Sequence, residues 1–160
     1  MDAAGSVAII TDQYNHLIRR VNLNNAAVTT IAGVTFGDVG INNFGSANGI
    51  GTAASFYFPV GVTMNGAGTF AIIADRNNHL LRRLNVASGV VATVAGDPTL
   101  LHGFANGVGT FSSFYYPAGA SMNAAGTFAI IVRRVCKYLP GANAMRVGTR
   151  RLPDGGMFVT

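Results

Sequence analysis

The sequence predicts an all-β chain built from repeated four-stranded antiparallel sheets. Three observations predict this fold class. The composition favours strands and tight turns over helices, because the 160 residues include 21 glycines, a single lysine and no glutamate. Apolar residues come in short runs of strand length, separated by glycine, proline and asparagine. The sequence also repeats itself with a period of about 60 residues.

The repeat is visible in two overlapping comparisons. Residues 7–33 align without a gap with residues 70–96, so that each position recurs 63 residues later. Residues 46–73 align with residues 104–131 at a spacing of 58, and 19 of these 28 pairs are identical. The two spacings differ in the loop after Gly33, where a change of length destabilises a fold only slightly. A repeat of this length, with several apolar runs, is typical of the blades of a β-propeller.

The first half of the complete unit, residues 59–96, predicts a hairpin. Gly61–Met64 is expected to form a short strand. The dipeptide Asn65-Gly66 follows at a turn, where it would supply the positive φ that tight hairpins need. Phe70–Ala74 is apolar throughout, as expected for a strand that is buried on both faces.

The second half of the unit predicts two more strands. Asp75–His79 is expected to be a tight polar turn, after which Leu80–Val86 forms the third strand. Ser88-Gly89 turns the chain again, and Val90–Ala95 forms the fourth strand. Short hairpins therefore join all four strands, and one unit makes one blade.

The other units are incomplete. Residues 7–33 supply the last three strands of one blade, and residues 117–135 supply two strands of another. In the latter, Val132–Val135 matches Leu81–Leu84 with the polar turn missing. The result is about two blades and an incomplete ring, whereas closed propellers use roughly four to eight blades. We therefore expect a part of a longer chain or a homo-oligomer that closes a ring, because open strand edges and apolar faces favour association.

The polar turn carries a family resemblance. Asp12-Gln13-Tyr14-Asn15-His16 and Asp75-Arg76-Asn77-Asn78-His79 share the pattern D-x-x-N-H, followed by an apolar and basic strand. The stretch A-N-G-x-G-T…F…P-x-G also occurs twice. Together these motifs resemble the NHL repeats of β-propeller proteins over residues 7–131. The resemblance implies NHL-type propeller repeats over residues 1–135, followed by a basic C-terminal tail over residues 136–160.

One departure from the family pattern bears on function. Leu17 and Leu80 stand where the family usually has arginine directly after the motif histidine. This removes positive charge from the face through which some animal NHL proteins contact RNA. The departure therefore argues against RNA binding by the blades.

The net charge of +5 is confined to the C-terminal end. Residues 1–132 carry five arginines and five aspartates and are neutral, whereas residues 133–160 carry five arginines and a lysine against one aspartate. Nucleic acid is therefore expected to bind, if at all, through the basic tail. No aromatic residue lies between Arg146 and Arg151 to stack on a base.

Cysteine usage and hydropathy exclude several classes of protein. The single cysteine, Cys136, excludes an intrachain disulfide and a cysteine-based zinc site. The N-terminus lacks a basic region followed by a long apolar core, so we expect no signal peptide. Residues 98–132 contain no Asp, Glu, Lys or Arg, but Pro117 and Gly119 interrupt a stretch that would need about 20 apolar residues to span a membrane. We expect no membrane span, and the compartment stays open.

Six residues of the two polar turns are the first candidates for chemistry. The aspartates could act in catalysis, and the histidines could bind a metal or act as bases. Equivalent positions in different blades favour a structural role instead, with each aspartate accepting N–H bonds in an Asx-type turn and each histidine bonding to a carbonyl or carboxylate. Zinc needs three or four converging ligands, and the chain has three histidines in all. We therefore expect no catalytic residue, no metal site and no cofactor. The turn residues expected to be structural are Asp12, Asn15, His16, Asp75, Asn78 and His79.

Arginines and aromatic residues are the candidates for binding. Each of the pairs Arg19-Arg20 and Arg82-Arg83 could bind phosphate or an acidic peptide. Successive side chains of a strand point to opposite faces, so each pair places at most one arginine on a face. The alternative for each pair is a salt bridge to a neighbouring blade. The aromatic runs Phe56–Phe58 and Phe114–Tyr116 precede prolines and are expected to pack between blades, the alternative being that they stack on bases or on peptide side chains. The residues expected to form an interaction surface are Tyr14, Arg76, Arg19 and Arg82.

These observations predict a non-catalytic interaction scaffold. Rigid strands hold variable loops on a shared surface, so we expect a protein or peptide to bind at the ends of the blades. Two alternatives stay open. The first is a fragment of a metal-dependent NHL-like lyase, since the peptidyl-amidoglycolate lyases use a metal in the central channel of a propeller. The second is an RNA-binding NHL propeller.

Overall fold

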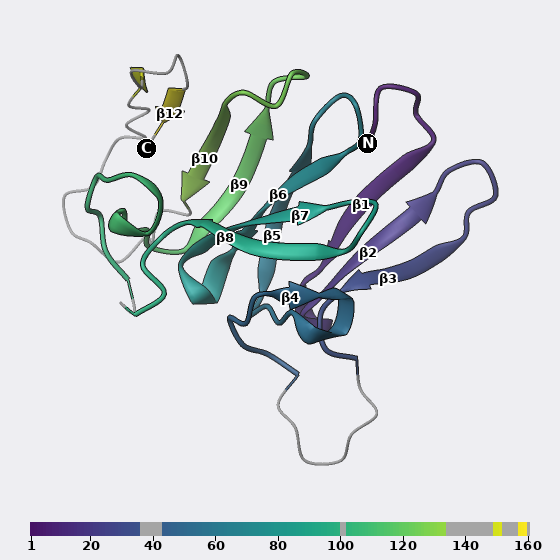
Figure 1. Cartoon of the computed structure of the whole chain (residues 1–160), viewed down its shortest axis with the longest axis horizontal. Helices are drawn as coiled ribbons and strands as arrows, with labels where there is room; N and C mark the ends of the chain where they lie inside the picture. Colours follow the sequence, from purple (N-terminus) through teal and green to yellow (C-terminus); the bar gives the residue numbers. More distant parts are fainter. Residues whose placement is uncertain (36–42, 100–101, 134–148, 152–156, 160) are drawn as a thin grey trace, which may run out of the picture.

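The computed structural model describes residues 1–35, 43–99, 102–133, 149–151 and 157–159 (Figure 1). Within these residues the chain is all-β, with antiparallel strand pairs, short 3₁₀ turns and no α-helix. The predicted fold class is therefore confirmed. No helix in this part of the chain is long and apolar enough to cross a membrane.

The complete unit forms one blade, which we call blade 2. Its strands follow the order β5-β6-β7-β8, with the short strand β4 added outside β8. All four expected strands are confirmed, with ends that differ from the prediction by at most two residues. Their bounds are β4 (Gly49–Ile50), β5 (Pro59–Met64), β6 (Phe70–Asp75), β7 (Leu80–Asn85) and β8 (Val90–Ala95).

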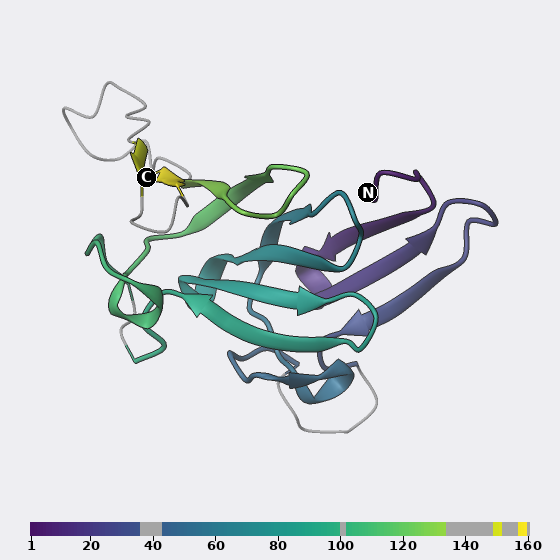
Figure 2. The same cartoon turned by 45° about the horizontal axis from the view of Figure 1, so that its top comes forward.

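Two incomplete sheets flank this blade (Figures 1 and 2). Blade 1 has three strands in the order β1-β2-β3, and blade 3 consists of β9 and β10. A separate hairpin near the C-terminus pairs β11 with β12. In the described residues no backbone ladder joins a strand of one blade to a strand of another. The bounds are β1 (Val7–Asp12), β2 (Leu17–Asn22), β3 (Val28–Ala32), β9 (Pro117–Met122), β10 (Ala129–Arg133), β11 (Thr149–Arg151) and β12 (Met157–Val159).

The expected match of residues 132–135 to a third strand is wrong for its first two residues. Val132 and Arg133 end β10, where Arg133 pairs with Pro117 as Asp75 pairs with Pro59 in blade 2. Arg133 therefore takes the position of the motif aspartate. Residues 134 and 135, and with them the expected boundary before the basic tail, lie outside the described residues.

The hairpin turn between β5 and β6 also differs from the prediction. Positive φ falls on Gly68, at 70°, and not on Gly66. Asn65 contributes through its side chain, because its Oδ1 accepts hydrogen bonds from the backbone N–H groups of Thr69 and Phe70 at 2.9 and 3.1 Å. The Asn65 side chain thus stabilises the turn by hydrogen bonds, while Gly68 adopts the positive φ at which the chain reverses.

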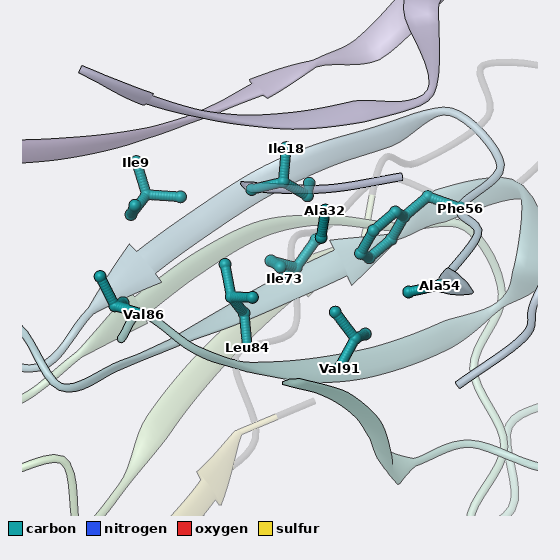
Figure 3. Packing of buried hydrophobic residues seen from close by; sticks show 9 residues of the cluster. All are labelled: Ile9, Ile18, Ala32, Ala54, Phe56, Ile73, Leu84, Val86 and Val91. Atoms are coloured by element: carbon teal, nitrogen blue, oxygen red, sulfur yellow. The ribbon is translucent and has the colours of Figure 1, made fainter. Parts of the chain in front are cut away.

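The blades pack face to face around a hydrophobic core (Figure 3). Blade 1 presents Ile9, Ile18 and Ala32 to blade 2, while blade 2 presents Ile73, Leu84 and Val91. The segment that connects the two blades adds Ala54 and Phe56, whose ring is fully buried. Burying such a ring contributes about 2–3 kcal/mol. The aromatic packing expected at Phe56 is confirmed.

One face of blade 1 stays open. Ile10 and Val28 are 46% and 52% exposed, although their equivalents in blade 2, Ile73 and Val91, are buried against blade 1. The same sequence positions are therefore core in one blade and surface in the next. This matches the expectation that an incomplete ring leaves apolar faces open.

Candidate functional site

Each D-x-x-N-H motif folds as a single 3₁₀ turn between two strands. The turns are η1 (Gln13–Asn15) and η3 (Arg76–Asn78). His16 and His79 end them in the left-handed conformation, with φ of 59° in both. Histidine adopts this conformation more readily than most residues, which explains why the motif can end on it.

A buried ion pair lies beneath the second turn. The carboxylate of Asp75 and the guanidinium of Arg82 are 2.9 Å apart, and both side chains are fully buried. Asp75 also accepts hydrogen bonds from the Asn78 side chain at 2.7 Å and from the backbone N–H of Tyr57 at 2.8 Å. Burial raises the pKa of Asp75 to about 6, against the opposing effect of these donors and of Arg82. Burial also lowers the pKa of Arg82.

Arg82 ties the connecting segment to blade 2. Its guanidinium donates to the backbone oxygens of Ser55 and Ala47 at 3.2 and 2.8 Å and to Oδ1 of Asn48 at 2.9 Å. It also lies 5.4 Å from the centre of the Phe56 ring. Arg82 is therefore a residue of the interior that orders the chain between blades 1 and 2.

These contacts correct three expectations. Arg82 does not contribute to a surface, because it is fully buried, is paired with Asp75 and donates hydrogen bonds to the segment that covers it. Its salt bridge lies within its own blade and not across to a neighbour. Asp75 accepts no hydrogen bond from the backbone of its own turn, so the Asx-type turn is wrong there. The acidic side chain instead joins three separate segments of the chain.

Blade 1 repeats the network in an open form. Asp12 and Arg19 are 3.3 Å apart, and their side chains are 28% and 30% exposed. Asn15 donates to Asp12 at 2.9 Å, as Asn78 does to Asp75. Within the described residues, no segment covers this pair as residues 47–56 cover the pair in blade 2. Arg19 thus stays partly exposed, and its place in an interaction surface stays a prediction.

Each motif histidine accepts a hydrogen bond from the residue that precedes the first strand of the next blade. Nδ1 of His16 accepts the backbone N–H of Phe58, and Nδ1 of His79 accepts that of Tyr116, each at 3.1 Å. We expected these rings to bond to a carbonyl or carboxylate, and that expectation is wrong because the observed partner is a backbone donor. An acceptor at Nδ1 requires a neutral ring. Burial lowers the pKa of both histidines, which favours the same neutral form.

The residues that the histidines hold have an unusual backbone. Phe58 and Tyr116 have φ of 52° and 51°, and each precedes a proline. Bulky side chains rarely adopt positive φ, and a residue before proline normally prefers an extended conformation. Such strain persists only where the surroundings impose it, and it is common at binding sites. Here it occurs twice at equivalent positions.

Aromatic rings gather around each histidine. Junction cluster 1 contains His16, Phe44, Tyr57 and Phe58, with Phe44 stacked on Tyr57 at 4.5 Å between ring centres. Junction cluster 2 contains His79, His102, Tyr115 and Tyr116, with His102 at 4.9 Å from Tyr115. The members after the histidines correspond to one another at the spacing of 58 residues.

Residues of the 3₁₀ turns extend each cluster. Tyr14 is 78% exposed and packs edge-on against Phe58 at 5.5 Å, while the Arg76 guanidinium lies 5.0 Å from the centre of the Tyr116 ring. Phe44 and Tyr115 are 42% and 38% exposed. Tyr14 and Arg76 therefore lie against the half-buried rings of Phe58 and Tyr116, at the blade ends where we expect a partner to bind.

The sequence comparison missed part of these clusters. Phe44 and His102 differ in residue type and lie two residues before the repeated stretches of 46–73 and 104–131. Their spacing of 58 residues was the available signal. The strained backbone of Phe58 and Tyr116 had no signal in the sequence, because aromatic residues give no indication of positive φ.

The described residues contain no group of three or more His, Cys, Asp or Glu side chains that could hold a metal ion. The clusters instead combine exposed rings, a neutral histidine and, in junction cluster 2, an arginine. This arrangement can bury apolar and charged side chains of a partner. The expectation of a non-catalytic protein stays a prediction.

Comparison with known proteins gives a structural similarity only. No family model and no curated protein matches this sequence, so the NHL resemblance stays a prediction. A Bacteroides thetaiotaomicron protein of unknown function matches with a TM-score of 0.65 and 20% identity, over 81% of this chain and 30% of that protein. Auxiliary nutrient binding proteins of Bacteroides ovatus and Bacteroides thetaiotaomicron match with TM-scores of 0.60 and 0.58 and identities of 21% and 22%.

These matches place the fold within part of larger proteins. The two auxiliary nutrient binding proteins align with 74% and 73% of this chain, and the chain spans 30% of the length of each. At such identities the likeness concerns the fold alone. The chain is thus an all-β unit with distant structural similarity to part of larger Bacteroides proteins.

Proposed function

We propose that the chain is a non-catalytic interaction module that binds a protein or peptide. The binding face is the end of the blades that carries turns η1 and η3 with junction clusters 1 and 2. The observation that carries this proposal is the recurrence of the clusters, each with a buried histidine that fixes a strained aromatic residue beside exposed rings.

The physical argument rests on preorganisation. A binding site gains affinity when its side chains need little ordering on contact. Tyrosine and phenylalanine rings supply large contact areas with few rotatable bonds, and aromatic residues are enriched at interfaces. The hydrogen bond from the backbone to His16 or His79 holds these rings in place before a partner arrives. A purely structural contact would not need rings as exposed as Tyr14 and Phe44.

The alternatives have less support. A lyase with a metal in a central channel would need ligands, and the described residues offer no cluster for one. An RNA-binding blade surface would need excess positive charge, whereas residues 1–132 are neutral. The structurally similar proteins do not separate binding from catalysis, because at 18–22% identity the likeness concerns the fold alone.

Selection from a random-peptide phage library tests the proposal. The bait is the full chain, and the comparison is a double variant, Tyr14→Ser with Tyr115→Ser, which removes one exposed ring from each cluster. Leu23→Ser is the matched control, because Leu23 is 45% exposed at the opposite end of blade 1. We expect enriched peptides to bind the wild type and the control but not the double variant. A selection without enrichment, or peptides that bind all three proteins equally, would contradict the proposal.

A further inference from the structure

We infer that junction cluster 2 is a subsite for an acidic side chain of a bound peptide, whereas junction cluster 1 is a subsite for an apolar or aromatic one. This inference rests on the proposed function, because it assigns ligand chemistry to the same binding face. It follows from a comparison of two sites that share a framework and differ at four positions.

The shared framework is closely reproduced. The histidine accepts a backbone N–H at 3.1 Å in both clusters. The ring of the residue that donates this N–H lies 4.8 Å from the histidine in junction cluster 1 and 4.7 Å in junction cluster 2, edge-on in both. The same residue has φ of 52° or 51°. Differences in binding must therefore come from the side chains around the framework.

Four positions differ between the clusters, and three of them change strongly in chemistry, because Phe58 and Tyr116 differ only by a hydroxyl group. Gln13 and Tyr14 of η1 correspond to Arg76 and Asn77 of η3, and Phe44 corresponds to His102. Junction cluster 1 thus carries an exposed tyrosine and phenylalanine against the shared rings. Junction cluster 2 carries an arginine and an exposed histidine instead.

Positive charge is concentrated at junction cluster 2. The Arg76 guanidinium lies against the ring of Tyr116, and within the described residues it donates no side-chain hydrogen bond to the protein. The His102 ring lies 5.7 Å from the His79 ring, and burial together with the nearby Arg76 lowers the pKa of His79. The motif carboxylate of this blade, Asp75, already bonds to Arg82 and Asn78.

A carboxylate fits this arrangement. Arginine donates to a carboxylate through two parallel N–H groups, and bonds between charged partners are the stronger ones. The rings of Tyr115 and Tyr116 would shield such a bond from water on one side. At junction cluster 1 the nearby charged groups are Asp12 and Arg19, which neutralise each other. An acidic side chain would gain nothing there, and exposed rings favour an apolar one.

An exchange of residues between the clusters tests the inference. Arg76→Gln with His102→Phe replaces the arginine and the exposed histidine of junction cluster 2 by their counterparts in junction cluster 1, and Gln13→Arg with Phe44→His makes the reverse exchange at junction cluster 1. The probes are two capped peptides, acetyl-Tyr-Gly-Glu-Tyr-amide and the same peptide with Gln for Glu. Backbone amide NMR shifts of Tyr115 and Tyr116, and of Tyr57 and Phe58, report binding at each cluster.

We expect the Glu peptide to bind junction cluster 2 at least about tenfold more tightly than the Gln peptide at low salt, as one charge-assisted hydrogen bond allows. The preference should disappear in R76Q/H102F and should appear at junction cluster 1 in Q13R/F44H. The second exchange keeps the test decisive if the first variant does not fold. Equal binding of the two peptides, or a preference that survives R76Q/H102F, would overturn the inference while leaving the proposed function intact. If neither peptide shifts any resonance of the binding face, the proposed function fails as well.

Discussion

Replacing Arg82 by methionine should destabilise the protein far more than the same change at Arg19. The two arginines occupy equivalent positions of consecutive blades and form equivalent ion pairs. Arg82 is fully buried, whereas the Arg19 side chain is 30% exposed. A comparison of Arg82→Met with Arg19→Met therefore measures the effect of burial on an ion pair whose local sequence is nearly the same.

The expected magnitudes follow from the contacts of each residue. Removing one partner of a buried ion pair costs about 3–5 kcal/mol, because the remaining charge is left without compensation. Arg82→Met also removes the donors to Ser55, Ala47 and Asn48, while the methionine fills much of the volume of the arginine stem. Removing Arg19 breaks a pair that water already screens, which costs about 0–1 kcal/mol.

The pH dependence adds a second test of the same variant. Burial already raises the pKa of Asp75 to about 6, and loss of Arg82 would raise it further. In Arg82→Met the folded state would therefore bind a proton that the unfolded state, with its ordinary carboxyl pKa, releases. The loss of stability relative to wild type should shrink as the pH falls from about 8 to about 5.

Equilibrium unfolding in urea measures both effects. Far-UV circular dichroism and tyrosine fluorescence are suitable probes, since the chain has five tyrosines and no tryptophan. We expect the free energy of unfolding to fall by at least about 3 kcal/mol for Arg82→Met and by about 1 kcal/mol or less for Arg19→Met near pH 8. Similar losses for the two variants, or a loss below about 1 kcal/mol for Arg82→Met, would refute the reasoning.

Three further predictions concern the histidines and the core. His79→Asn should change the free energy of unfolding by less than about 1 kcal/mol, because asparagine tolerates the left-handed backbone and its Oδ1 can replace Nδ1 as the acceptor. His79→Ala should cost about 1–3 kcal/mol. Equal losses for the two variants in urea unfolding would count against the hydrogen bond from Tyr116 to His79. The lowered pKa of His16 and His79 contributes stability that is complete above about pH 6.5 and is lost as the pH falls toward the lowered values. The raised pKa of Asp75 changes stability with pH in the opposite direction, so the difference in unfolding free energy between wild type and H16N/H79N should isolate the histidine contribution. A difference that does not depend on pH would contradict this prediction. Ile73→Ala should cost about 2–5 kcal/mol of unfolding free energy because Ile73 is buried, and Ile10→Ala should cost less than about 1 kcal/mol because Ile10 is 46% exposed. Equal melting temperatures for the two variants would argue against the packing of blade 1 on blade 2.

The sequence predicted the blades because the repeat supplied an internal comparison. The strands from Pro59 to Ala95 could be placed from alternating apolar runs and turn residues, and the three strands before Gly33 followed by alignment. Both kinds of evidence are local, because hairpin strands follow one another along the chain. Arg133 shows the limit, since an apparent match to a third strand was in fact the end of β10.

The site could be predicted only in part, because its properties depend on segments that are distant in sequence. Arg19 and Arg82 have almost the same neighbours, L-I-R-R-V and L-L-R-R-L, yet one is partly exposed and the other is buried. The difference comes from residues 47–56, which cover the ion pair of Arg82 and leave that of Arg19 partly exposed. The partner of His16 likewise lies 42 residues away at Phe58, and no local motif specifies that contact.

The most direct test of this account is the protonation of the two motif histidines, since their hydrogen bonds place the aromatic rings of the binding face. Long-range ¹H–¹⁵N correlation NMR of the imidazole rings, recorded well above the ordinary histidine pKa of about 6.5, identifies which nitrogen carries the proton. The structure predicts an unprotonated Nδ1 and a protonated Nε2 in both His16 and His79. A proton on Nδ1 of either ring would mean that the histidine does not hold the strained aromatic residue of the next blade, and the proposed binding face would lose its basis.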